Sequence, residues 1–144
     1  MIGLMLALTL QNTSTPDLLA LAEKAGRDVG AIQICQNYGY QSNLAALQKY
    51  YQPLTDRAAS EGRSDEAMAA FTAAADREKQ ALVLEANTSQ ISPSEFLANT
   101  ERGLERLQRR CHDISQAYPD VMTDTTVGDR MIRDILARIR APRN

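Results

Sequence analysis

A stripe of mostly apolar side chains along residues 97–118 is the sequence feature that most restricts how this chain can fold. Its members recur at alternating spacings of three and four: Leu97, Thr100, Leu104, Leu107, Cys111, Ile114 and Tyr118. This spacing is typical of a helix that lies against other helices in a bundle. Ser92 can cap this helix, with Pro93 as its first residue and Glu95 as the acid of a capping box. The stripe therefore predicts a long helix that ends before Pro119.

A second helix is predicted near the beginning of the chain. Thr15, Pro16 and Asp17 supply a cap, a proline at the first helical position and an acid in the first turn. Apolar residues then recur at spacings of three and four. We expect this helix to run to about Gln36 and to stop at Gly39.

Residues 42–62 predict another helix, capped by Ser42 and closed by Gly62. Pro53 falls inside it, and a proline removes a backbone hydrogen bond and clashes with the preceding turn. We therefore expect a kink near residues 51–52, or two short helices that meet there. The apolar face of this segment is expected to comprise Leu44, Leu47, Tyr51 and Leu54.

Residues 64–87 and 126–140 predict two more helices. The first has Ser64 as its cap, and its inner face is expected to hold Met68, Phe71, Ala75 and Leu82. The second is rich in arginine, and its inner face is expected to hold Met131, Ile132, Ile135, Leu136 and Ile139. Five helices with short connections and no credible strand indicate an all-α fold, a single-domain bundle over residues 15–144.

The composition agrees with this fold class. A chain of 144 residues can close one hydrophobic core without help from a metal ion. Alanine and leucine are frequent, whereas tryptophan is absent, and such a mixture favours helices over strands. The formal net charge of −2 gives no indication of a nucleic-acid partner.

Residues 1–14 form a separate apolar N-terminal segment, in which MIGLMLALTL is followed by a polar stretch. This resembles the apolar region and polar exit of a secretory signal peptide, although it lacks the usual basic start and a clean cleavage site. The segment is shorter than the roughly 20 residues of a membrane-spanning helix, so no integral membrane span is predicted. We expect an exported protein, periplasmic or secreted. The alternative is a cytoplasmic protein in which this segment packs on the domain as a strap.

The two cysteines, Cys35 and Cys111, lie far apart in the sequence and belong to no CxxC motif. A redox dithiol, a zinc knuckle and c-type haem attachment are therefore excluded. An even pair in a chain with an export-like start predicts one structural disulfide, Cys35–Cys111.

His112 follows Cys111 and is the only histidine of the chain. Neighbours on a helix point about 100° apart, so the sulfur and the imidazole are not expected to form a catalytic pair. A lone histidine beside core methionines is also weak evidence for a metal or haem site. No di-iron motif, phosphate-binding loop or catalytic triad is present in the sequence. We therefore predict no catalytic residues, no metal ligands and no cofactor.

Tyr38, Tyr40, Tyr50 and Tyr51 cluster near the turn between the first two predicted helices. Tyrosine suits both the edge of a core and an interaction surface, because it has a large apolar body and a polar tip. We predict these four residues as a partner-binding patch; the alternative is that they close one end of the bundle. The basic C-terminal helix is a second candidate surface, although its broad apolar face favours core packing.

These features favour a small exported, non-catalytic helical protein that binds an unknown protein or a component of the cell envelope. One alternative is an intracellular structural or adaptor bundle with free thiols. Another is a bundle that carries a metal or cofactor.

Overall fold

The computed structural model describes residues 17–83 and 92–141, and within these ranges the fold is all-α, as predicted. Five α-helices form a single bundle, and the described residues contain no strand. The elements are α2 (Leu18–Asn37), a 3-10 turn η1 (Leu44–Leu47), α3 (Gln48–Ser60), α4 (Ser64–Leu82), α5 (Pro93–Ala117) and α6 (Thr126–Arg140). The predicted division of the chain at residue 14 lies outside the described residues.

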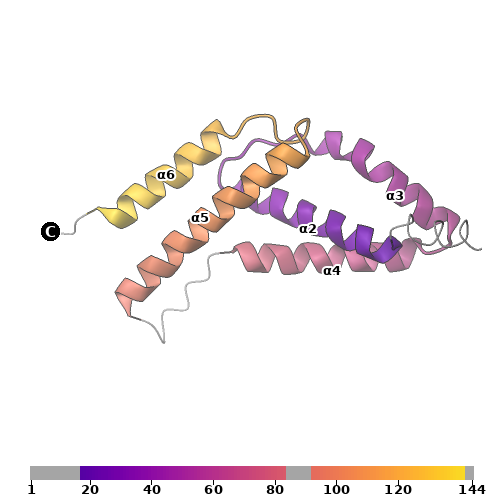
Figure 1. Ribbon diagram of the computed structural model, residues 1–144, viewed down its shortest axis with the longest axis horizontal. Helices are drawn as coiled ribbons and strands as arrows, with labels where there is room; N and C mark the ends of the chain where they lie inside the picture. The colour runs from indigo at the N-terminus through magenta and orange to yellow at the C-terminus, as the bar shows by residue number, and fades with distance from the viewer. Residues whose placement is uncertain (1–16, 84–91, 142–144) are drawn as a thin grey trace, which may run out of the picture.

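The helices α2 and α4 pack side by side along most of their length (Figure 1). Their close approach depends on Gly26 and Gly30 of α2. A Cβ on Gly30 would stand 2.5 Å from the backbone oxygen of Ala75, and one on Gly26 would likewise overlap the backbone of Phe71. Only glycine permits this separation, because any side chain would push the two helices apart.

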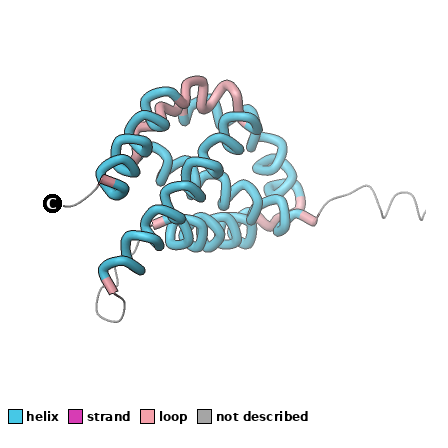
Figure 2. The backbone as a smooth tube through the Cα atoms, turned by 60° about the vertical axis from the view of Figure 1, so that its left-hand side comes forward, coloured by secondary structure: helices cyan, strands magenta, loops and turns pink. Residues whose placement is uncertain are grey.

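The other helices surround this pair. α3 packs against α2 and α4, α5 crosses the pair, and α6 lies on α5 (Figure 1). The loops that follow α2 and α5 meet at one edge of the bundle (Figure 2), where the backbone N–H of Asn43 donates to the carbonyl of Val121 at 2.7 Å. Val121 and Met122 of this second loop are buried. The α2–α3 connection is thereby held against the α5–α6 connection.

Several helix ends follow the sequence signals. The Ser92 hydroxyl accepts the N–H of Glu95 at 3.2 Å, with Pro93 as the first residue of α5. The end of α2 is set at Gly39, whose φ of 88° an L side chain rarely adopts. α6 has the predicted bounds.

Other boundaries differ from the predictions. Ser42 caps no helix, because its hydroxyl accepts a hydrogen bond from the Gln36 side chain. The chain instead forms η1, and the join to α3 falls at residues 47–48 and not near Pro53. Pro53 lies inside α3, which continues through it to Ser60.

The helix predicted over 64–87 is shorter than expected. Ser64 is the first residue of α4 and not its cap; the N-cap position is Arg63, which makes no side-chain capping hydrogen bond. Val83 already has an extended backbone, and the guanidinium of Arg106 on α5 donates to the Ala81 carbonyl at 3.2 Å. A carbonyl at the end of α4 is thus satisfied by α5, which lets the helix end at Leu82.

Three residues predicted for the core are exposed. Met68 is 62% exposed, Met131 41% and Leu44 47%. The buried residues of α4 are mostly alanines, and the bulkier Met68 is not among them. They are Ala67, Ala74, Ala75 and Leu82. In α6 the buried positions are Gly128, Ile132 and Leu136, so its inward face is narrower than the apolar residues of the sequence suggest.

Candidate functional site

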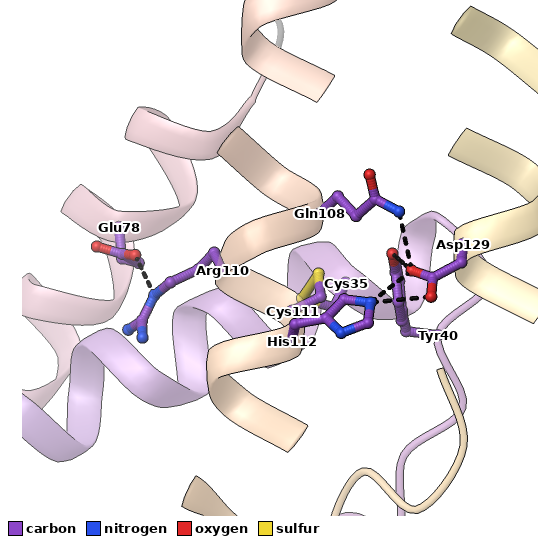
Figure 3. Close-up of a disulfide and its surroundings, with 8 residues drawn as sticks. All are labelled: Cys35, Tyr40, Glu78, Gln108, Arg110, Cys111, His112 and Asp129. Carbon is purple, nitrogen blue, oxygen red and sulfur yellow. Dashed lines mark hydrogen bonds and ion pairs between the residues drawn. A yellow bond between two sulfur atoms is a disulfide. The ribbon is translucent and has the colours of Figure 1, made fainter. Parts of the chain in front are cut away.

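The disulfide joins Cys35, near the end of α2, to Cys111, in the C-terminal half of α5 (Figure 3). The two Cα atoms are 5.9 Å apart, and both cysteines are completely buried. The pairing predicted from the sequence is therefore the one that the structure contains. It closes a loop with a sequence separation of 76 and fixes the crossing of α5 over α2.

His112 points away from the disulfide and toward α6, so Cys111 and His112 form no pair (Figure 3). Its Nε2 lies 2.8 Å and 2.9 Å from the two carboxylate oxygens of Asp129. The Tyr40 hydroxyl and the Gln108 amide also donate to this carboxylate, at 2.6 Å and 3.2 Å. We call these four residues the Asp129 cluster; it connects the α2–α3 loop, α5 and α6.

Electrostatics in the Asp129 cluster favour an ionised aspartate. Partial burial alone would raise the pKa of Asp129, but the hydrogen bonds from Tyr40, His112 and Gln108 hold this pKa below its usual value. Burial and the neighbouring carboxylate raise the pKa of Tyr40 above its usual range. The cluster thus holds α6 on α5.

A second polar cluster lies between α2, α4 and α5, around Asp28. Only 6% of Asp28 is exposed, and it is the one charged residue that is buried among those the structure describes. Its carboxylate accepts hydrogen bonds from the Tyr118 hydroxyl, from Arg110 at 3.0 Å and from Lys24 at 3.3 Å. Arg110 also donates to Glu78 at 2.9 Å. Burial and the bond to Asp28 raise the pKa of Tyr118 above its usual range.

The four tyrosines of the predicted patch do not share one location. Tyr40 is 2% exposed and belongs to the Asp129 cluster, where its ring packs on Gly128. Tyr50 and Tyr51 instead meet Tyr118 edge to face, with ring centroids 5.0 Å and 6.3 Å away. Tyr38 packs half-buried against the main core. Only Tyr38, Tyr50 and Tyr51 offer accessible surface, and their role in partner binding stays a prediction.

Tyr50, Tyr51 and Tyr118 line a groove of about 560 Å³ between α2, α3 and the end of α5, here called the tyrosine groove. Its apolar lining includes Leu21, Ala25 and Leu54. This volume falls within the range of small-ligand sites, roughly 300–1,000 Å³. The groove collects two of the four predicted tyrosines at one site.

Sequence reasoning missed two parts of this groove. Tyr118 was predicted as a core residue of the α5 stripe, and its position there gave no sign that it also meets Tyr50. The cations at the groove, Lys24 and Arg57, resemble ordinary exposed residues of helices in the sequence. Tyr118 and these two cations can be assigned to one groove only when it is known that α3 folds back along α2.

No group of three or more potential metal ligands occurs within residues 17–83 and 92–141. In the same part of the chain, none of the helices has the length and apolar character needed to cross a membrane.

Comparison with known proteins gives no relative. Neither a protein-family model nor a curated protein nor a solved structure matches this chain.

Proposed function

We propose that this protein is a small exported, non-catalytic helical domain that binds another protein or an envelope component through the tyrosine groove. The observation that carries the proposal is the groove itself. It combines three tyrosine rings with an aliphatic lining in an open depression. Surfaces that bind partners are enriched in tyrosine, which gives a large contact area and loses little rotamer freedom.

Two features support export. The buried Cys35–Cys111 disulfide suits an oxidising compartment, because structural disulfides are rare in the cytosol. Residues 1–10 have the apolar character of a signal peptide. Thiol counting on the native protein from cell fractions tests this part. An oxidised protein in the periplasmic or culture fraction is expected, whereas two free thiols in a cytoplasmic fraction would favour the adaptor alternative.

Photocrosslinking in the source cells tests the binding site. A photoreactive benzoylphenylalanine is placed at Ala117, which is exposed and lines the groove, and in a matched control at Ala59, an exposed residue of α3 that does not line it. We expect a discrete crosslinked partner from position 117 and none from position 59. Loss of the crosslink in a Tyr50→Ala variant would support the groove. The same partners from both positions would overturn it.

A further inference from the structure

The tyrosine groove has a definite charge. Among the residues that line it, the charged ones are Lys24 and Arg57, both cations. The acids that pair with them do not line the groove: Asp28 is buried behind it, and Glu61 lies just beyond the end of α3. A ligand in the groove therefore meets positive charge next to apolar surface.

Both cations can bind a further anion. The Lys24 side chain is 63% exposed and lies 3.3 Å from Asp28, a carboxylate that Arg110 and Tyr118 already bind. Arg57 donates its Nε to Glu61 at 2.8 Å, which is the one side-chain hydrogen bond of its guanidinium among the described residues. A guanidinium has five N–H donors and an ammonium three, so both retain donors for a carboxylate.

The rest of the groove lining is apolar. It includes Leu21, Ala25 and Leu54 beside the tyrosine rings. Lys24 lies near Tyr118, because both side chains donate to the Asp28 carboxylate. Tyr118 is held in place by its bond to Asp28 and by its edge-to-face contact with Tyr50. A ring that is already fixed costs little entropy on binding, so this end of the groove is suited to hold a large apolar side chain.

The length of the groove limits the ligand. Tyr50 and Arg57 of α3 mark its two ends, and seven residues of helix span about 10 Å. An extended peptide covers that distance with about three residues. A membrane acyl chain extends about 15 Å, half of the hydrocarbon core, and would exceed the groove.

We infer that the tyrosine groove binds a short extended segment of a partner protein in which an acidic residue stands one or two positions from a large apolar or aromatic residue. The inference rests on the proposed function and specifies the chemistry of the partner. The acid is bound by one of the two cations, Lys24 beside Tyr118 or Arg57 at the other end of the groove, and the apolar residue lies against the rings of Tyr50, Tyr51 and Tyr118.

A displayed library of random nonapeptides tests this inference on the full chain. Three variants are compared with the wild type: Lys24→Ala/Arg57→Ala removes the cations, Ala117→Trp fills the groove, and Gln116→Trp is a matched control at an exposed neighbour. A further control, Arg77→Ala/Arg102→Ala, removes two exposed cations elsewhere. Far-UV circular dichroism of each variant establishes that its helices are intact.

We expect enriched peptides that combine Asp or Glu with a nearby large apolar residue. Recovery of these peptides should fall at least tenfold with Lys24→Ala/Arg57→Ala and with Ala117→Trp, and remain unchanged with both controls. Two outcomes would overturn the inference and leave the proposed function standing. In the first, Ala117→Trp abolishes recovery of peptides that contain no acidic residue. In the second, the peptides bind equally well after the two cations are removed. Uncharged apolar peptides that resemble residues 1–10 would overturn it too, and would assign the groove to the chain's own N-terminal segment.

The remaining outcomes separate the other ligands. In a second arm lauric acid is titrated against the wild type and Ala117→Trp. Laurate binding that Ala117→Trp abolishes, without any enriched peptide, would overturn the inference and indicate an acyl ligand. If neither peptides nor laurate depend on the groove, both the inference and the proposed function fail.

Discussion

The guanidinium of Arg110 on α5 lies 3.0 Å from the carboxylate of Asp28 on α2, and 2.9 Å from that of Glu78 on α4. One side chain thus connects the three helices that form the centre of the bundle. Burial disfavours its charge, yet the bonds to Glu78 and Asp28 raise the pKa of Arg110 above its ordinary value. The same Asp28 carboxylate fixes Tyr118, so this polar cluster also supports the wall of the tyrosine groove.

Replacing Arg110 by alanine leaves Asp28 buried without its main countercharge. Breaking a buried ion pair from one side costs about 3–5 kcal/mol, and we expect a loss near the lower end because Lys24 and Tyr118 remain as partners. Urea unfolding measures the change. Arg109→Ala, at an exposed neighbour, should shift the free energy of unfolding by no more than about 0.5 kcal/mol. Equal effects of the two substitutions would show that the cluster contributes little.

The all-α fold, the five helices of the described residues and the disulfide could be predicted from the sequence because local signals encode them. The α5 stripe, the Ser92 cap and the stop at Gly39 depend on neighbours in the chain. Cys111 lay on that stripe, so its burial followed from the same periodicity.

Features that depend on contacts between distant segments were not predicted. Asp28 looks like an exposed acid until Arg110 and Tyr118 are placed beside it. Gly26 and Gly30 of α2 are not helix-forming residues. Their role in close packing can be recognised only when the backbone of α4 is placed beside them. Tyr40 is likewise separated from Tyr50 and Tyr51 because it binds Asp129 of α6, and no local sequence pattern predicts where α6 packs.

Gly30→Ala tests the close packing of α2 on α4. Alanine is the better helix former by about 1 kcal/mol, but its Cβ would stand 2.5 Å from the Ala75 oxygen. We expect the overlap to dominate and to destabilise the protein by about 1–3 kcal/mol in urea unfolding. Gln33→Ala, on the exposed side of the same helix, serves as the control. A stabilised Gly30→Ala variant would contradict the packing described for these helices.

Removal of the disulfide is expected to lower the free energy of unfolding by about 4 kcal/mol, because it releases a long closed loop in the unfolded chain. Cys35→Ala/Cys111→Ala avoids placing a hydroxyl in the core, where both residues are fully buried. Urea unfolding with and without dithiothreitol provides the measurement. Reductant should destabilise the wild type and leave the double variant unchanged. Equal unfolding midpoints for oxidised and reduced wild type would refute the stabilising role.

Alkaline titration reports on the buried tyrosines. Burial and the adjacent carboxylates raise the pKa of Tyr40 and Tyr118 above the ordinary value of 10.0. The neutral hydroxyls therefore stabilise the fold below pH 10, and this contribution is lost as pH rises through the folded-state pKa. Absorbance at 295 nm should record no ionisation of these two residues before alkaline unfolding. Tyr118→Phe should leave the absorbance change below the unfolding pH the same as in the wild type, and a smaller change would contradict the assignment.

Acid should selectively weaken the attachment of α6. The hydrogen bonds from Tyr40, His112 and Gln108 outweigh the effect of burial and hold the pKa of Asp129 below 3.8. A depressed folded-state pKa contributes stability that is present above pH 3.8 and lost as the pH falls through the folded value. Asp129→Asn should therefore cost about 2 kcal/mol at pH 5, and this difference from the wild type should decline as the pH falls below 3.8. Urea unfolding across this pH range measures it, with Asp134→Asn on the exposed side of α6 as the control. If the cost of Asp129→Asn stays constant over the whole acid range in which the protein remains folded, the ionised carboxylate does not hold α6 on α5.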